Sequence, residues 1–464
     1  MSLHQIVEIT RRSFRANDAA MNTIAQNVAN IDTPGYARRR VTLRSEAVTG
    51  SGIQNSLLPG VARGVGVSVQ AYERTRDLLL QRAGWEAQAG LGSSAEEYRI
   101  LSAAEGLFPV QGDGTLQAAV ADFFNAWSDL ANNPTDTGAR LALRNRADTV
   151  ARTLNGLDLE LRRLSEQTRQ DLDAGVARIN ELLDRIAALN ESVRTTRAGG
   201  ITDYAAADER DVLVKELAAL VPLRVEEDTA GNFNLTIGGK VVLESSHVTP
   251  LRIEDDGGTL QVVFGDTGLA FAPAAEGDGK LGAWLRGLTD TLPGMQQALD
   301  TLAGTLVEEV NTLHRSGYGL DGGTGRDFFD PAGTSAGSIQ LDAGILADAT
   351  TIAASAAAGN LGDSTTALAI AELRTTPLFN GGTDTPEDYI IGVVSDLGAR
   401  AERASARATS QSAVADHLDS LQRGATGVSM DEELTDLIRY QQAYGATARV
   451  VSTVQAMFDS LLAM

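Results

Sequence analysis

Apolar residues at both ends of the chain recur in alternating steps of four and three residues. This spacing lines up one side of an α-helix and is typical of helices that pair in a coiled coil. Polar residues interrupt each row twice, Thr10 and Asn17 in the first and Gln441 and Gln455 in the second. We therefore expect a helix at each terminus with a seam for a partner. The seam positions are Val7, Phe14, Met21, Ile24 and Val28 at one end, and Leu434, Leu437, Gln441, Tyr444, Val451, Phe458 and Leu462 at the other.

The C-terminal row is broadened by further apolar residues, Ile438, Val454 and Leu461 among them. This width predicts a helix that touches more than one neighbour. The terminal segments also differ in charge: residues 1–40 contain 6 Arg and 3 acidic residues, a net of +3, and residues 425–464 contain 2 Arg and 5 acidic residues, a net of −3. Opposite charges favour pairing of the two ends. The alternative is two ordinary amphipathic helices packed on a globular core.

The segment NVANIDTPGYARRR, residues 27–40, follows the first helix. Asn30 is suited to a helix end because Asn tolerates the left-handed conformation. Pro34 and Gly35 fit the two central positions of a type II turn. Tyr36 and the run Arg38 to Arg40 offer an aromatic anchor and charge for docking, or else form a solvated loop.

A long helix is predicted in the middle of the chain. No proline occurs between Pro134 and Pro222, and apolar residues recur at helical spacing from Val150 to Val193. An unbroken helix of about 60 residues would be on the order of 90 Å long, although Gly156 and Gly175 are possible interruptions. Further helices are expected near 283–316 and 386–424.

After Pro222 the apolar pattern changes to alternation, which predicts strands. Two hairpins are expected, one turning at Gly238-Gly239 and the other at 255–258, and residues 338–346 also look strand-like. We therefore predict an elongated, mainly α, multi-domain rod with a smaller β-rich insertion and with its N- and C-terminal helices paired as a coiled coil. The expected domains are 1–60 with 425–464, 61–221 with 282–424, and 222–281, with or without 327–357.

Composition and motifs exclude several functions. The net charge of −22 disfavours nucleic-acid binding, and the lack of cysteine removes thiolate chemistry and disulfides. No window approaches 18 consecutive apolar residues, so membrane insertion is not expected, and the N-terminus has no secretory apolar core. Ser335 fits a GxSxG pattern, but the segment before it is no buried strand. The four histidines lack metal-ligand spacing, so neither a catalytic site, nor a metal, nor a cofactor is predicted.

NVANIDTPGY closely resembles the N-terminal signature of flagellar rod, hook and hook-associated proteins, and residues 427–462 resemble their C-terminal signature. Residues 306–329 and 358–373 resemble the hook-associated members specifically. The sequence departs from the pattern of this family in two respects. Gly445 stands in the last helix, which it weakens by about 1 kcal/mol relative to Ala, and the central region is short. The resemblance adds signature positions to the expected assembly site: Asn27, Asn30, Thr33, Pro34, Gly35, Tyr36 and Tyr440.

The resemblance implies a structural protein and not an enzyme. Its copies would stack through the terminal helices into a helical tube and act as an adaptor between hook and filament. The implied partners are other copies of the chain, the hook protein, the next hook-associated junction protein, the flagellar export apparatus and a cytoplasmic export chaperone. The implied location is the extracellular flagellum, reached without a cleaved signal peptide. Two alternatives remain open: another axial subunit of rod or hook, and a secreted hydrolase or adhesin.

Overall fold

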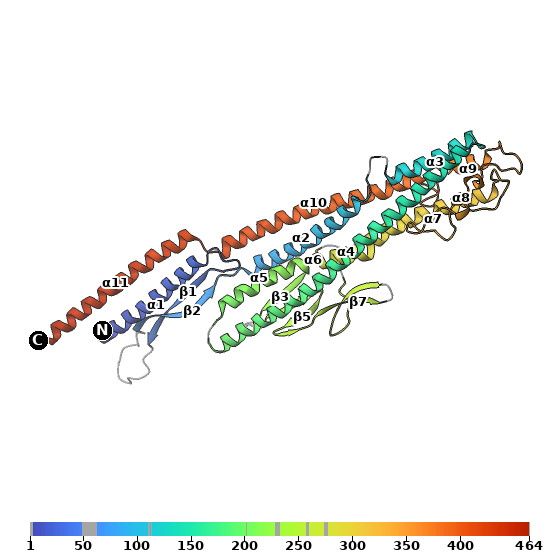
Figure 1. The fold of residues 1–464 in the computed structure, drawn as a ribbon. Helices are drawn as coiled ribbons and strands as arrows, with labels where there is room; N and C mark the ends of the chain where they lie inside the picture. Colours follow the sequence, from blue (N-terminus) through green and yellow to red (C-terminus); the bar gives the residue numbers. More distant parts are fainter. Residues whose placement is uncertain are drawn as a thin grey trace.

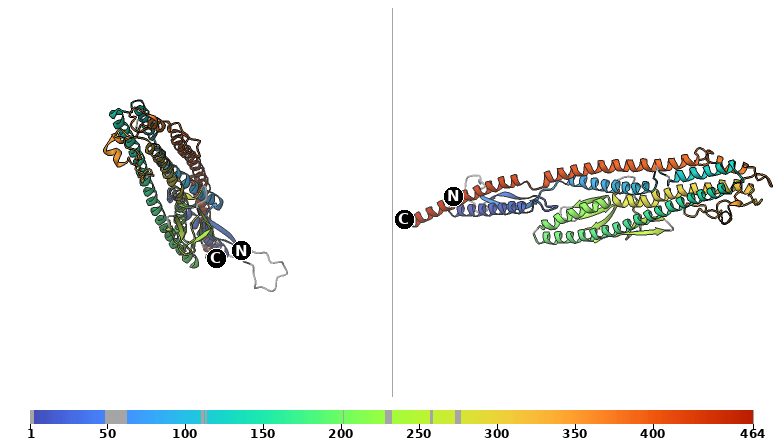
Figure 2. Two further views of the ribbon diagram at one scale, coloured as in Figure 1. Left: turned by 90° about the vertical axis from the view of Figure 1, so that its right-hand side faces the viewer. Right: turned by 45° about the horizontal axis from the view of Figure 1, so that its top comes forward.

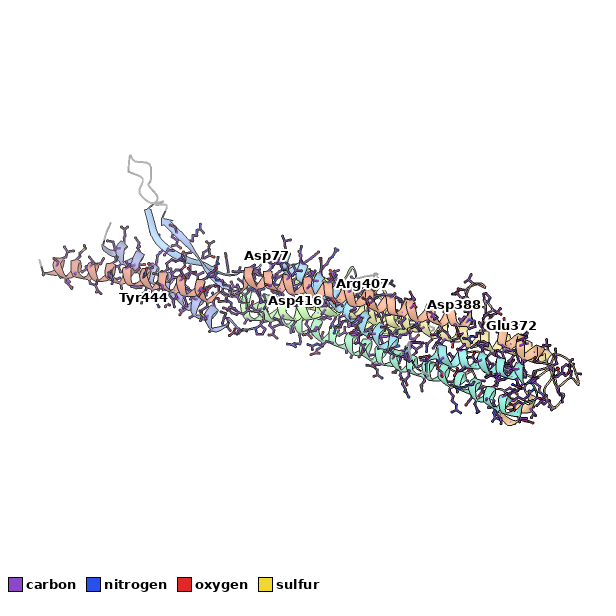
Figure 3. The ribbon with its side chains drawn as sticks, turned by 90° about the horizontal axis from the view of Figure 1, so that it is seen from above. Asp77, Glu372, Asp388, Arg407, Asp416 and Tyr444 are labelled. Carbon is purple, nitrogen blue, oxygen red and sulfur yellow. The ribbon has the colours of Figure 1, made fainter. Side chains whose placement is uncertain are left out.

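The computed structural model describes residues 3–48, 63–109, 112, 114–200, 202–227, 233–256, 259–272 and 277–463. The chain forms an elongated rod with both termini at the same end (Figure 1, Figure 2). Figure 3 places Tyr444 toward that end and Glu372 near the opposite end. The predicted mainly α, elongated fold with small β-sheets is confirmed.

The terminal end of the rod combines two helices with a β-hairpin. Helix α1 (Leu3–Ala29) lies beside α11 (Met430–Leu462) and beside the antiparallel strands β1 (Arg39–Val48) and β2 (Arg63–Arg74). Arg39 pairs with Arg74 at the base of this hairpin, and the register shifts after Thr42 and after Glu46. The sequence reasoning did not predict these strands, although Val65, Val67, Val69 and Ala71 of β2 alternate as in a strand.

The body of the rod is a bundle of long helices: α2 (Leu78–Glu105), α3 (Leu116–Asn132), α4 (Thr137–Ala198), α5 (Tyr204–Leu220), α6 (Gly279–Arg286), α7 (Leu292–Ser316) and α10 (Pro386–Thr426). A π-helical turn, Gly287–Thr291, joins α6 to α7. Side-chain caps begin several helices; Asp77, for example, accepts hydrogen bonds from the N–H groups of Leu79 and Leu80. Helices α2 and α10 run side by side along the rod.

Helix α4 confirms the predicted long central helix and continues unbroken for 62 residues. Its apolar row, including Leu154, Leu172 and Ile186, is buried against the neighbouring helices and sheets. Neither glycine interrupts it. Gly156 has open space where a Cβ would lie, and Gly175 lets the ring of Trp284 approach the helix.

Two small antiparallel sheets pack beside α4. One contains β3 (Leu223–Glu227), β4 (Phe233–Ile237), β5 (Lys240–Glu244) and β6 (His247–Val248), and the other contains β7 (Leu251–Asp256) and β8 (Thr259–Phe264). Both predicted hairpins are confirmed. Gly238 and Gly239 have φ of +56° and +82°, as a tight hairpin turn with two left-handed residues requires. Of the second turn, Gly257 and Gly258 lie outside the described residues.

The far end of the rod is irregular, with short helices α8 (Ala343–Ala347) and α9 (Thr365–Glu372) and a 3-10 turn, Ala349–Thr351. The strand predicted over 338–346 is wrong. Only an isolated bridge joins Leu341 to Phe329, and Asp342 then caps α8 through the N–H of Gly344. This end lies away from the sheets (Figure 1).

Two buried polar side chains hold the irregular segment in place. Nε2 of His314 accepts a hydrogen bond from the Ala353 N–H at 2.8 Å, so Nδ1 carries the ring proton and donates it to the Arg326 carbonyl at 2.8 Å. The buried Arg140 donates to the carbonyls of Pro134 and Ile352. Both residues therefore act as internal cross-links between helices and loop.

Candidate assembly site

The seam between α1 and α11 is antiparallel and narrow. Phe14 and Tyr444 meet edge to face with ring centroids 4.7 Å apart, and the hydroxyls of Ser13 and Thr447 are 3.1 Å apart. Val454, about two helical turns beyond Thr447, is buried. The contact therefore follows a single row of α11 and leaves most of that helix uncovered.

The structure brings some of the predicted seam residues together and leaves others at the surface. In α1, Ile24 is buried, as are the polar seam residues Thr10 and Asn17, while Val7 is exposed. In α11, the row facing α1 passes through Leu437, Tyr440, Tyr444, Val451 and Val454. The predicted C-terminal row departs from it by one position at several points. The partly buried members are Phe14, Met21, Val28, Leu437, Tyr440 and Val451, and the exposed ones are Val7, Leu434, Ile438, Gln441, Tyr444, Phe458, Leu461 and Leu462.

Asn27 is the centre of a buried hydrogen-bonded knot at the end of α1. Its amide nitrogen donates to the Arg39 carbonyl at 2.9 Å and to Oε2 of Glu433 at 3.0 Å. Its oxygen accepts from the Arg39 N–H at 3.0 Å and from the Tyr36 hydroxyl at 2.9 Å. All four hydrogen-bonding positions of the amide are used. Burial raises the pKa of Tyr36.

Arg38 ties three further segments to this knot. Its Nε donates to Oε1 of Glu433 at 2.6 Å, and it also pairs with Glu432. Its backbone N–H donates to the Thr426 carbonyl at the end of α10, and its carbonyl accepts from Thr75 just before α2, both at 2.9 Å. Arg38 therefore lies where both chain crossings between the body and the terminal end meet. Of the run Arg38 to Arg40, the first is buried and only Arg40 is exposed.

The sequence reasoning missed Glu433, although it is almost fully buried. The available signal was its place in the row of α11, where an acidic residue interrupts apolar positions and requires a buried cation. The charge asymmetry of the two termini pointed to the same pairing without identifying the residues.

The turn at Pro34 and Gly35 folds as predicted and packs on α5, whereas Asn30 does not adopt the left-handed conformation expected at the helix end. Helix α1 ends at Ala29, and the Asn30 side chain donates to the Gln26 carbonyl at 2.9 Å. The Tyr36 N–H donates to the Thr33 carbonyl at 3.1 Å, which closes the turn around Pro34 and Gly35. Gly35 has a φ of +79°, and a Cβ there would lie 2.2 Å from a methyl of Val212. Glycine is thus needed for both conformation and space.

A chain of ion pairs links the hairpin to the body. Asp208 of α5 lies 3.2 Å from Arg39 and 3.1 Å from Arg74, which also pairs with Asp211. Arg76 continues the chain to Glu227 at 2.6 Å. Burial raises the pKa of Asp208 despite its two arginines. For Glu227, burial alone would raise the pKa, but Arg210 and Arg76 outweigh it and lower the pKa.

This network of ion pairs fixes the orientation of the hairpin relative to α5 more than it stabilises the fold. Buried ion pairs gain little net free energy because both ions lose their hydration, but removal of one partner costs about 3–5 kcal/mol. The hairpin and α5 are consequently held in one relative orientation.

The weak catalytic candidates do not form a site in the described part of the chain. Ser335 lies in a turn with its hydroxyl 2.7 Å from that of Ser338, and no helix begins directly after it. The imidazole nearest in sequence, His314, is already bonded through both nitrogens. The described residues contain no group of three His, Cys, Asp or Glu side chains placed to hold a metal ion.

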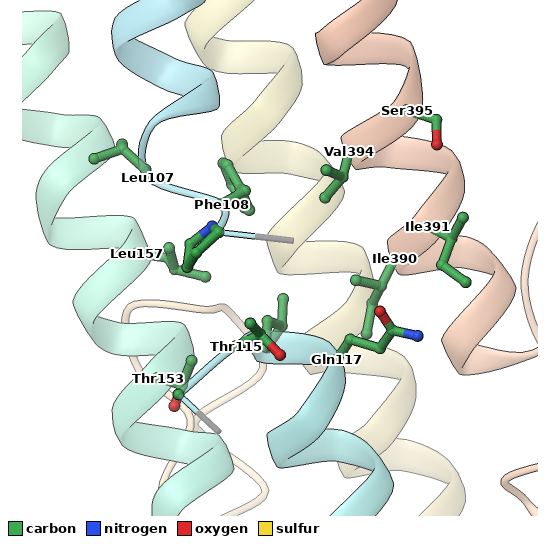
Figure 4. A pocket seen from close by; sticks show the side chains of 13 residues that line it. Leu107, Phe108, Thr115, Gln117, Thr153, Leu157, Ile390, Ile391, Val394 and Ser395 are labelled. Atoms are coloured by element: carbon green, nitrogen blue, oxygen red, sulfur yellow. The ribbon is translucent and has the colours of Figure 1, made fainter. Parts of the chain in front are cut away.

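A small cavity of about 100 Å³ lies between α4, α10 and the turn before α3 (Figure 4). Its walls are apolar, with Phe108, Leu157, Ile390 and Val394 facing inward and Thr115 and Gln117 at the edge. The described lining residues include no acid, base or thiol, so the cavity offers no proton-transfer group. Across the described ranges, no helix has the length and apolar character required to cross a membrane.

Comparisons with known proteins agree with this architecture. The model of the "Flagellar hook-associated protein FlgK helical domain" matches residues 101–329. The "Flagellar basal body rod FlgEFG protein C-terminal" model matches 425–464, and the "Flagella basal body rod protein" model matches 14–36. The last two matches cover α11 and the turn that contains the Asn27 knot.

Curated relatives match almost the whole chain. Flagellar hook-associated protein 1 of Bacillus subtilis is 26% identical over 493 aligned residues, covering 98% of this chain and 97% of the relative. The protein of the same name from Escherichia coli is 24% identical over 552, covering 99% and 100%.

A solved structure, the flagellar hook junction protein FlgK from Burkholderia pseudomallei, superposes with a TM-score of 0.67 at 15% identity, covering 75% of this chain and 100% of that one. That likeness establishes the fold. These comparisons therefore identify the chain as similar along its whole length to flagellar hook-associated protein 1, a structural component of the bacterial flagellum.

Proposed function

We propose that this chain is the adaptor between the hook and the filament of the flagellum, and that its copies assemble into a helical tube through α1 and α11. The observation that carries the proposal is the exposed apolar surface of α11. Besides Tyr444, eight large apolar side chains of this helix are exposed in the single chain: Met430, Leu434, Ile438, Val450, Met457, Phe458, Leu461 and Leu462. An apolar surface of this kind is typical of an interaction site.

The residues of the knot act as positioning residues for this assembly. Asn27, Tyr36, Arg38 and Glu433 fix where α11 begins relative to the body. Every copy then presents α11 at the same angle, which a regular lattice requires. The exposed side chains of α11 supply the contact itself.

We also propose three units along the rod, modified from the sequence-based boundaries. The terminal unit extends to about residue 76, beyond the expected boundary at 60, because β2 packs on α1. It is completed by residues 427–464. The long-helix unit follows, and the two sheets over 222–281 form the β-rich unit, without residues 327–357.

The proposed partners are other copies, the hook protein and the next hook-associated junction protein. The protein acts mechanically, without catalysis and without a cofactor. It reaches the outside of the cell through the flagellar export apparatus without a cleaved signal peptide, and a cytoplasmic chaperone covers α11 before export. Covering α11 would hide its exposed apolar side chains until assembly.

Deletion of the gene, followed by electron microscopy, tests the function. The expected phenotype is hooks without filaments, with flagellin released into the medium, and restoration by the intact chain. Immunogold labelling of the restored strain should mark only the boundary between hook and filament. Labelling along the whole hook or rod would assign the chain to another axial subunit, which is the second candidate.

A further inference from the structure

Five of the exposed apolar side chains of α11 form two separate patches on its flanks, whereas Phe458 and Leu462 continue the row that faces α1. The proximal patch consists of Leu434 and Ile438, which are 46% and 55% exposed. The distal patch consists of Val450, Met457 and Leu461, which are 43%, 50% and 59% exposed. Their centres are about 20 residues apart, which corresponds to about 30 Å along the helix.

The two patches lie on opposite flanks of the row that contacts α1. That row passes through Leu437, Tyr440, Tyr444, Val451 and Val454. At about 100° per residue, the proximal patch is rotated by roughly 105–145° in one direction from the row, and the distal patch by roughly 75–115° in the other. Neither patch can be covered by α1 of the same chain.

Much of the distal patch also extends beyond the end of α1. Because the helices are antiparallel and Phe14 faces Tyr444, Leu3 lies opposite about residue 455. Met457 and Leu461 therefore project past the first residues of α1, and the C-terminus lies beyond the N-terminus in Figure 1. The last turns need a neighbour from another molecule.

We propose that the proximal patch of one copy packs against the distal patch of the next, with parallel α11 helices displaced by about 30 Å along their length. The inference rests on the proposed function and specifies its contact. A two-fold contact would require one patch to meet itself, whereas two different patches on opposite flanks make a head-to-tail contact that repeats into a helical assembly. Copies related by one screw axis present α11 in the same direction, so the contact is parallel.

The absence of cysteine from the sequence makes the contact testable by disulfide cross-linking. The full chain carrying both Ile438→Cys and Met457→Cys is expressed in the deletion strain, and isolated flagella are oxidised. Since a disulfide requires Cα atoms within about 7 Å, the double variant should yield a ladder of multimers, and each single variant should remain monomeric. The matched control combines Ile438→Cys with Ala456→Cys, which lies at the same height as Met457 but on the wrong flank.

Several outcomes would overturn the contact. Disulfide-linked dimers from either single variant would indicate a two-fold contact. A ladder of equal yield from the control pair would show that cross-linking does not depend on which flank of α11 carries the cysteine. Filaments of normal number without a ladder would exclude this displacement but leave the junction function intact. Loss of filaments after deletion of the gene is scored separately, so the two failures are distinguishable.

If the cysteines prevent assembly, a photoreactive phenylalanine analogue at position 438 preserves the apolar bulk. Mass spectrometry should then find cross-links to residues 450–462 of another copy. Cross-links to residues 3–29 of another copy would instead show that the proximal patch packs on a neighbouring α1, and would refute the proposal.

Discussion

The burial of His314 makes the far end of the rod sensitive to acid. Its ring is 1% exposed and bonded through both nitrogens, and protonation would turn Nε2 from an acceptor facing the Ala353 N–H into a second donor. Burial lowers the pKa of His314 from 6.5 to about 4, although the Arg326 carbonyl and Asp327 oppose the shift.

The sign of the effect follows from proton linkage. Between pH 6.5 and pH 4 the unfolded chain binds a proton at this residue and the folded chain does not, so stability is lost as the pH falls. With these two pKa values, His314 alone lowers the free energy of unfolding by about 2 kcal/mol between pH 7 and pH 5, and by about 3 kcal/mol at pH 4. Above pH 7 its contribution is nearly constant.

The assay is urea unfolding at pH 7 and pH 5, followed by tryptophan fluorescence; of the three tryptophans, Trp127 has its ring centroid 6.4 Å from that of His314. His314→Gln keeps one donor and one acceptor but cannot titrate, so it should lose about 2 kcal/mol less than the native chain over this range. His417→Gln, on the exposed face of α10, is the matched control and should behave as the native chain. Equal pH dependence in the native chain and His314→Gln would refute the reasoning.

Three other changes have defined outcomes. Gly175→Ala should destabilise the chain by about 1–3 kcal/mol, because its Cβ would lie 2.2 Å from the Trp284 ring. Gly156→Ala, in open space on the same helix, should stabilise the chain by up to about 1 kcal/mol. Thermal unfolding measures both variants, and a shift of both melting temperatures in the same direction would contradict this prediction. Asn27→Ala leaves four polar groups without their Asn27 hydrogen bond and should speed amide hydrogen exchange in α1 of the assembled protein by at least about tenfold. The control Asn22→Ala, at an exposed position of the same helix, should change the exchange rate little. Equal exchange rates in the two variants would mean that the knot does not hold α1. Removal of residues 457–464 should leave a folded monomer, by circular dichroism, that is missing from the junction; global unfolding of the truncated chain would show that the terminal unit is needed for the body.

Local pattern was sufficient for the long elements of the fold. The apolar rows around Leu154 and Ile186 predicted α4, and Gly238-Gly239 predicted the first hairpin because few residues adopt such a turn. The hairpin β1–β2 was missed although the alternation of Val65, Val67, Val69 and Ala71 in β2 is a strand signal. The apparent strand at 338–346 failed because Asp342 supplies a helix cap that outweighs the β propensity of its neighbours.

The candidate site was predictable in location but not in its interactions. The signature from Asn27 to Tyr36 and the opposite charges of the termini indicated that the two ends meet. The bond from Asn27 to Glu433 and the pairing of Arg38 with Glu433 join two segments that lie 406 and 395 residues apart in sequence, so no local pattern could identify them. The predicted row on α11 differs from the observed row by one residue at several points. The reason is that alternating steps of three and four residues fit several faces of a helix whose apolar surface is broad.

The terminal unit joins the first long helix of the chain to the last, and this order has a consequence for biosynthesis. The ribosome makes α1 hundreds of residues before α11, so Asn27 has no Glu433 to bind until translation of α11 is under way. A product that stops anywhere in the body lacks α11, with both of its apolar patches and the carboxylate that Arg38 requires. Under the assembly proposed above, such fragments would lack the contact surface of α11, and the terminal unit would screen each copy for having been read through to that helix.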